Sequence, residues 1–225
     1  MNNFRLFALI LITLIPASLS AQKEGPGNWL MYFGTNKVTD KLSIHTEVQY
    51  RNHTAVLVTI EQLLLRTGLN YHITEKAIVT AGYGYVAGHI FESEQTHPET
   101  EEHRLFQQFI LKNSVGRFYF EHRYRFEERW VNKIFKTRAR YRLMLSIPLN
   151  RQKIEKGAFF IGIYDEVFVN LKQTFFDRNR LYGAVGYQFN KSANVQVGMM
   201  HQQVNTIGKW NLQFALTWNL DFRKK

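Results

Sequence analysis

The chain contains no cysteine, so no disulfide bond supports its fold. No stretch rich in proline, glycine or serine separates parts of different composition. After the N-terminal segment, no apolar run approaches the roughly 20 residues that a membrane-spanning helix needs. Apolar residues also fail to recur at helical spacing, so no convincing amphipathic helix is expected. These absences favour one domain that is held together by β-structure.

Residues 1–21 have the organisation of a secretory signal peptide. Arg5 supplies the positive start, residues 6–15 form a short apolar core, and Pro16 precedes small residues suited to cleavage. The apolar core is too short for a spanning helix. We therefore expect residues 1–21 to direct export and residues 22–225 to form a single domain.

Positive charge exceeds negative charge and is concentrated in one part of the chain. The sequence has 29 Lys and Arg against 18 Asp and Glu, a formal net charge of +11. Between Arg117 and Arg151, ten Lys or Arg side chains stand against three acidic ones. A basic chain invites a nucleic-acid interpretation. Because no nucleic-acid motif is present and the export signal argues against it, we expect no nucleic-acid partner.

Apolar and polar residues alternate with a period of two. In residues 117–130, aromatic side chains and His122 occupy one face, while glutamates and arginines occupy the other. Residues 136–149 repeat the pattern with Leu and Ile against arginines. Because side chains of a strand point alternately to opposite sides, each segment has an apolar face and a polar face. Eleven strands are expected: 28–37, 41–52, 61–73, 77–89, 102–113, 117–130, 136–149, 157–170, 178–190, 193–205 and 208–222.

These segments predict an all-β fold, an up-and-down antiparallel transmembrane β-barrel of about 12 strands, with a range of 10–12. Tight polar turns alternate with longer links at 53–60, 90–101, 131–135 and 171–177, as in barrels with short periplasmic turns and longer outer loops. The 90–101 link is then expected outside the cell. Because such barrels normally have an even strand number, either Gln22–Asn28 adds a strand or one segment lies outside the wall. A soluble barrel shows the same period with its faces exchanged, and it is the structural alternative.

Several stretches carry a resemblance to a known family. They are the strand Leu42–Arg51 and the stretches 63–71, 102–108, 121–129, 165–168 and 178–187. On these residues the chain resembles an uncharacterised outer-membrane β-barrel family of Bacteroidetes-type bacteria, domain of unknown function 2490. The resemblance implies a fold and a location but no activity. The chain departs from such barrels at its end, where Phe222 is followed by three basic residues instead of closing the last strand.

The arginines of segments 117–130 and 136–149 are expected inside the barrel. One arginine facing lipid near the membrane midplane costs about 2–4 kcal/mol, so four of them outside would rival the stability of a domain. With short connections, Glu127 is expected opposite Arg140 and Arg129 opposite Arg138, with Glu102 opposite Arg129 and Arg104 opposite Glu127. The predicted charge lattice comprises Glu102, Arg104, Glu121, Arg123, Arg125, Glu127, Arg129, Arg138, Arg140 and Arg142. It either fills the interior or forms a path for anions.

A second polar cluster is expected across the 171–177 link, from Glu166, Asn170, Arg180 and Tyr182. It is interpreted as a further interior ion pair, with a catalytic role as the alternative. The eight histidines show no recognised metal spacing, so neither a metal nor a cofactor is expected. Ser114 and Ser146 have no evident histidine partner, so an enzyme is not expected.

The sequence thus predicts an integral outer-membrane barrel with a narrow, arginine-rich polar lumen. It would act as a structural or interaction barrel, or as a small passage that favours anions. An outer-membrane lipid-modifying enzyme and a soluble periplasmic lipocalin-like binding barrel are the alternatives. The expected partners are outer-membrane lipids and, during insertion, the barrel-assembly machinery. We expect a monomer, and no ligand can be named from the sequence.

Overall fold

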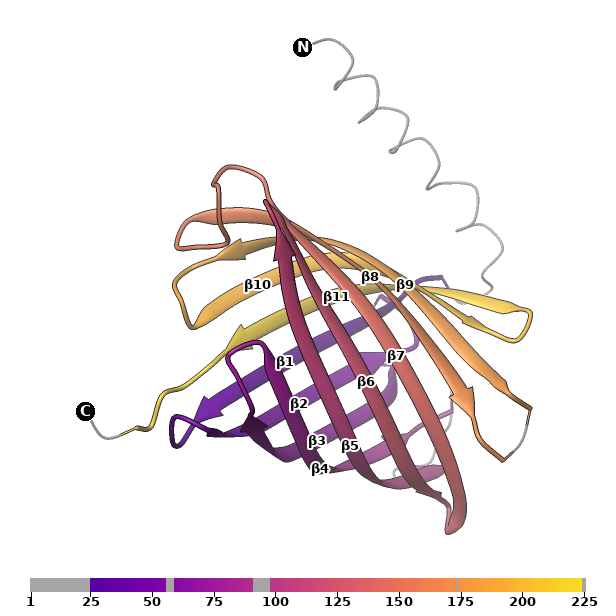
Figure 1. Ribbon diagram of the computed structural model, residues 1–225. Coiled ribbons are helices and arrows are strands. Elements are labelled where there is room, and N and C mark those ends of the chain that lie inside the picture. Colours follow the sequence, from indigo (N-terminus) through magenta and orange to yellow (C-terminus); the bar gives the residue numbers. More distant parts are fainter. Residues whose placement is uncertain (1–24, 56–58, 91–97, 173, 224–225) are drawn as a thin grey trace.

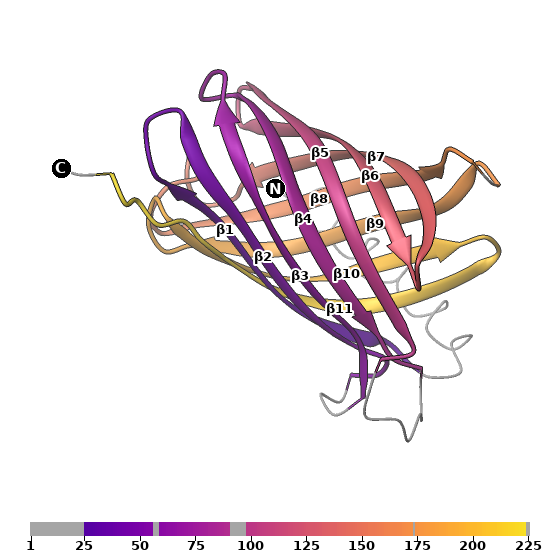
Figure 2. The same cartoon turned by 90° about the horizontal axis from the view of Figure 1, so that it is seen from below.

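The computed structural model describes residues 25–55, 59–90, 98–172 and 174–223, and these form a closed β-barrel of eleven strands (Figures 1 and 2). The expected signal peptide lies outside the described residues. In the described part, no helix is long and apolar enough to cross a membrane. The strands are β1 (Gly27–Lys37), β2 (Leu42–Asn52), β3 (Ile60–His72), β4 (Ala77–Gly88), β5 (Thr100–Val115), β6 (Phe118–Val131), β7 (Ile134–Pro148), β8 (Ala158–Asn170), β9 (Phe176–Gln188), β10 (Ala193–Val204) and β11 (Ile207–Trp218).

Each strand pairs antiparallel with the next along the chain, and β1 closes the barrel by pairing in parallel with β11. The closing pair must be parallel because, in an up-and-down chain of eleven strands, the first and last strands run in the same direction. The prediction of an all-β barrel within the range of 10–12 strands is confirmed. The expectation of an even number was wrong: β1 starts at Gly27 with no strand before it in the described residues, and every predicted segment lies in the wall.

The parallel seam continues beyond the last residue of β11. The Lys37 amide donates to the carbonyl of Leu220 at 2.8 Å, and the Phe222 amide donates to the carbonyl of Lys37 at 2.9 Å. The Thr35 amide also donates to Asn219 Oδ1 at 2.7 Å. Residues 219–222 therefore extend the contact between the two strands that close the barrel.

Two short turns set a register that differs from the predicted one. Gly116 and Arg117 join β5 to β6, and Asn132 and Lys133 join β6 to β7. Positive φ at Gly116 (58°), Asn132 (45°) and Lys133 (69°) fits two-residue hairpin turns. The expected longer link at 131–135 is absent. The β5–β6 and β6–β7 pairings both differ by two residues from the predicted ones.

The shift changes which predicted lattice residues lie directly opposite one another. Glu127 faces Arg138, Arg125 faces Arg140 and Arg104 faces Arg129. The predicted pairs Glu127–Arg140 and Arg129–Arg138 are therefore wrong as direct opposites, as are Glu102–Arg129 and Arg104–Glu127. A shift of two residues keeps every side chain on its expected face, because the side-chain period of a strand is two.

The wall has an apolar outer face and a polar inner face. Outward side chains include Leu69 and Val185, which are 54% and 56% exposed. Inside, large aromatic rings lie over glycines of the neighbouring strand: Phe106 is opposite Gly82, and Phe160 is opposite Gly186. A Cβ on Gly186 would lie 2.2 Å from Phe160 Cζ, so only glycine leaves room for this ring.

This packing predicts different effects for two neighbouring glycines of β9. Gly186→Ala should lower the free energy of unfolding by about 1–3 kcal/mol, because the added methyl overpacks against Phe160. Gly183→Ala should leave it nearly unchanged, because nothing lies within 4 Å of the added Cβ. Urea unfolding of the refolded barrel measures both. Equal effects of the two substitutions would show that Phe160 does not occupy this position.

Candidate functional site

Ion pairs between strands that are not neighbours in the wall identify the interior of the barrel. Arg66 of β3 lies 4.0 Å from Glu127 of β6, although β4 and β5 stand between them in the sheet. Arg123 of β6 likewise reaches Glu166 of β8 at 2.7 Å, across β7. Side chains on the convex outer wall diverge, so contacts of this kind form only on the inside.

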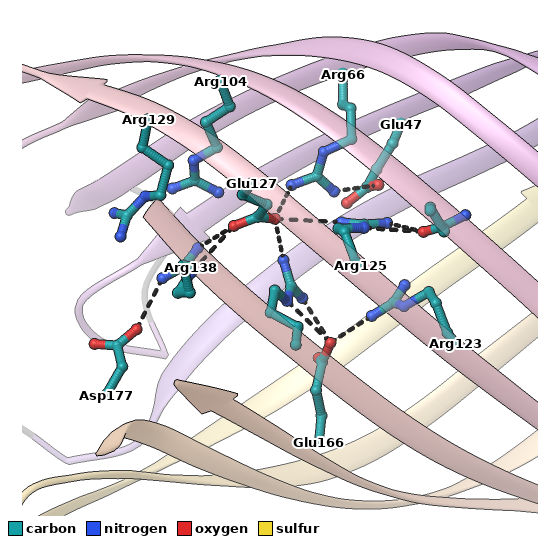
Figure 3. A network of polar contacts seen from close by, with 12 residues as sticks. Glu47, Arg66, Arg104, Arg123, Arg125, Glu127, Arg129, Arg138, Glu166 and Asp177 are labelled. Carbon is teal, nitrogen blue, oxygen red and sulfur yellow. Dashed lines mark hydrogen bonds and ion pairs between the residues drawn. The ribbon is translucent and has the colours of Figure 1, made fainter. Parts of the chain in front are cut away.

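Glu127 lies at the centre of this network (Figure 3), and it is 0% exposed. Arg138 donates to Glu127 Oε2 from Nη2 at 2.6 Å and from Nε at 3.0 Å. Arg140 donates to Glu127 Oε1 at 2.7 Å. Arg125 and Arg66 approach the same oxygen at 3.7 Å and 4.0 Å. One buried carboxylate therefore gathers four arginines from β3, β6 and β7.

Glu166 forms a second centre that is linked to the first. Its Oε1 accepts hydrogen bonds from Arg123 Nη2 at 2.7 Å and from Arg140 Nη2 at 2.8 Å. Arg140 thus bridges Glu127 and Glu166. Arg142 and Arg180 lie directly opposite Glu166 on the adjacent strands β7 and β9. The predicted charge lattice and the second predicted cluster are therefore linked through Arg140.

Two further carboxylates pair the remaining members of the predicted lattice. Glu102 accepts two hydrogen bonds from Arg104, at 2.5 Å and 2.8 Å, and two from Arg129. Glu121 accepts one from Arg142 at 2.5 Å. Parallel hydrogen bonds of the kind that Glu102 receives are the strong, geometrically specific form of Arg–carboxylate pairing. Each of the ten predicted residues therefore has a partner of opposite charge, in three groups: one around Glu127 and Glu166, one around Glu102, and the pair Glu121–Arg142.

The second predicted cluster is only partly assembled. Glu166 and Arg180 face each other, while Tyr182 stacks on Tyr164 with ring centroids 4.6 Å apart. Asn170 lies near the end of β8, where its Nδ2 donates to the carbonyl of Thr174 at 3.2 Å. Asn170 is therefore part of the β8–β9 connection and does not contact Glu166.

Several charged interior residues were not predicted from the sequence, among them Glu47, Arg66 and Asp177. Glu47 of β2 accepts a hydrogen bond from Arg66 of β3 at 2.6 Å, and Asp177 of β9 accepts one from Arg138 at 2.9 Å. Glu47 and Arg66 each lie on the polar parity of their strand, so parity was the signal available for them. Nothing in the pattern marks Asp177, because a register irregularity at Phe168 and Val169 sets its position.

Buried aromatic rings supply further contacts to these arginines. Phe168, which is almost fully buried, has the guanidinium carbons of Arg140 and Arg180 within 4.3 Å and 4.9 Å of its ring centroid. Phe106 has Arg125 at 5.0 Å and Arg66 at 5.4 Å. A cation held over a ring face is attracted by the ring quadrupole. Phe106 and Phe168, which stand among polar residues on the inner faces of β5 and β8, therefore also contact the buried arginines.

The chemistry available to this interior is electrostatic. Guanidinium groups are donors only and stay charged, so the site can attract and hold anions but cannot exchange protons near neutral pH. In the part of the chain that the structure describes, no group of three or more His, Asp or Glu side chains is placed to hold a metal ion.

Removing the central carboxylate should destabilise the barrel strongly. Glu127→Gln keeps the shape but removes the charge that Arg138 and Arg140 share, and breaking a buried pair of this kind costs about 3–5 kcal/mol. Its neighbour Glu128 points to the opposite face of β6, so Glu128→Gln is a matched control with little or no loss. Urea unfolding in detergent or vesicles measures both. A Glu127→Gln variant as stable as the control would contradict the central role of this carboxylate.

The comparisons with known proteins give a family and no activity. Residues 26–213 match a family described as Protein of unknown function (DUF2490). No curated protein and no solved structure matches the chain. The match covers all of β1 to β10 and the first part of β11, up to Gln213. The chain therefore belongs to this family of unknown function, DUF2490.

Proposed function

We propose that this protein is an integral outer-membrane β-barrel whose filled, arginine-rich interior restricts passage and favours small anions. The observation that carries the proposal is the inverted distribution of polarity. Large apolar side chains cover the outside, and charged side chains are buried inside. A soluble barrel of this size needs the reverse arrangement, because water would contact the outer face.

The outer face supports contact with lipid. Exposed Leu, Ile, Val, Phe, Tyr and Trp side chains point outward from strands all around the wall, among them Leu30, Leu65, Leu105, Leu143, Leu181 and Phe214. A shallow apolar groove of about 910 Å³ runs over the outer faces of β3 to β8, with Tyr71, Tyr124 and Tyr141 along it. Soluble monomers rarely expose apolar areas of this extent. Acyl chains of outer-membrane lipids are the proposed occupants of this surface.

The inner face supports a preference for anions. Among the described interior residues, arginines outnumber carboxylates: Arg51, Arg66, Arg104, Arg123, Arg125, Arg129, Arg138, Arg140, Arg142, Arg178 and Arg180 stand against Glu47, Glu61, Glu102, Glu121, Glu127, Glu166 and Asp177. A channel lined by uncompensated positive charge favours anions. Because Phe106, Phe168 and Glu127 are almost fully buried, side chains fill the middle of the barrel. The proposed passage is therefore narrow.

An enzymatic role has one observation in its favour. Ser43 Oγ lies 2.7 Å from His72 Nε2, within the distance that a nucleophile and its base require. However, Ser43 is 0% exposed, and its hydroxyl also accepts a hydrogen bond from Asn70 Nδ2 at 3.0 Å. A substrate would have to displace these neighbours to reach the hydroxyl. The pair fits an interior polar network better than a lipid hydrolase.

Conductance in planar bilayers tests the proposed passage. The unmodified barrel should show a small conductance that favours anions over cations. Arg125→Ala should raise the conductance and reduce the anion preference, because it removes a buried positive side chain while Glu127 keeps Arg138 and Arg140. Arg223→Ala is the control, since Arg223 lies past β11 and binds Asp40 and Asp221 outside the barrel interior.

Two outcomes would reject this proposal. A large, cation-selective conductance in the unmodified protein contradicts both the filled interior and its positive charge. Recovery of the folded barrel as a soluble monomer without detergent contradicts membrane integration. In that case the soluble binding barrel would become the better interpretation.

A further inference from the structure

We propose that the barrel holds a small oxyanion, such as inorganic phosphate, between Arg51 and Arg180 beside Trp29. The inference deepens the proposed function because it gives the interior a ligand class and a place. It does not require the barrel to conduct, so binding and passage can succeed or fail separately.

The two arginines share one aromatic ring. The guanidinium carbon of Arg51 lies 3.9 Å from the Trp29 ring centroid, and that of Arg180 lies 5.0 Å from it. Arg51 comes from β2 and Arg180 from β9, on either side of the seam between β1 and β11. Two positive charges thus lie close to the same ring. They repel each other unless an anion binds between them.

Neither arginine forms an ion pair within the described residues. Arg51 donates only to the neutral amide oxygens of Gln49 and Gln62, at 2.5–2.9 Å. Arg180 donates one hydrogen bond, from Nε to Gln202 Oε1 at 2.9 Å. The carboxylates beside them already have other partners: Glu166, opposite Arg180, binds Arg123 and Arg140. Glu61, at the irregularity opposite Arg51, lies 3.6 Å from Lys209. Both side chains are only 8% exposed, so water does not readily compensate these charges.

Two further donors at this place have no acceptor. Trp29 Nε1 and Gln213 Nε2 are buried without a hydrogen-bond partner among the described residues. Trp29 and Gln213 lie directly opposite each other across the parallel seam, with exposed fractions of 3% and 1%. Unsatisfied buried donors are rare because each costs about 1–3 kcal/mol. Their coincidence with two unpaired guanidinium groups indicates a site built for an acceptor with negative charge.

The chemistry of these donors selects the ligand class. A guanidinium matches the oxygens of phosphate, sulfate or carboxylate, and the indole and amide N–H groups add single hydrogen bonds. Trp29, Arg51 and Arg180 lie toward the end of the barrel that carries the connections 53–59 and 171–175. Entry from this end is therefore the shorter route to the proposed site.

Trp29 provides a direct readout. Trp130, Trp210 and Trp218 lie on the outer parity, so a variant with all three replaced by Phe reports on Trp29 alone. The refolded full-length barrel in detergent is titrated with inorganic phosphate at constant ionic strength, and fluorescence is recorded. We expect a saturable change. Arg180→Gln and Arg51→Gln should each weaken binding at least tenfold, while Arg223→Gln should leave it unchanged. Acetate and glycerol phosphate, titrated in the same way, define the size of oxyanion that the site accepts.

Each possible outcome of these titrations either supports or rejects the proposed site. No saturable response to phosphate in a barrel that shows heat-modifiable migration overturns the site. Equal weakening by Arg223→Gln overturns it too, because it would indicate general attraction to a basic protein. If Arg180→Gln fails to refold, Arg180→Lys replaces it, and the loss of the planar fork should still weaken binding. Binding without measurable conductance keeps the site and rejects the passage; conductance without binding does the reverse.

Discussion

A single carboxylate that solvent does not reach, Glu127, determines how the interior of this barrel is organised. Arg138 and Arg140 bind its two oxygens, and Arg66 and Arg125 approach it from other directions. A buried guanidinium is costly unless it is paired, so the position of this carboxylate decides where the arginines can lie. Arg140 also forms an ion pair with Glu166, which in turn binds Arg123. The network continues through shared partners and is not a set of separate pairs.

The number of strands imposes a second constraint. Eleven strands in up-and-down order leave β1 and β11 parallel, and parallel pairing is slightly less stable per residue than antiparallel pairing. Hydrogen bonds from residues 219–222 lengthen the seam at one end. At the other end the seam carries Trp29 and Gln213, whose buried donors lack acceptors. Buried donors without an acceptor therefore lie at the place where the wall closes.

The faces of the strands could be predicted from the sequence, but the register could not. A period of two assigns Arg138 and Arg140 to the inner face whatever the pairing, because shifts of two residues preserve it. The register depends on whether Asn132 and Lys133 adopt positive φ, and the sequence marks this only weakly without glycine. The contacts of Phe106 and Phe168 with arginines could not be predicted either. Each ring stands among polar residues on the inner face of its strand, and its partners are known only once the neighbouring strands are placed. Which glycine makes room for each ring likewise follows from pairing alone.

The central claim is that apolar side chains face lipid while arginines and Trp29 face the interior. Bilayers whose acyl chains carry bromine quench tryptophans that contact them. Two variants lacking Trp130, Trp210 and Trp218 are compared: one keeps Trp29, and the other carries Trp29→Phe with Leu181→Trp, a half-exposed outer position in the middle of β9. The account predicts strong quenching for Leu181→Trp and none for Trp29. Quenching of Trp29 together with an unquenched Leu181→Trp would contradict it.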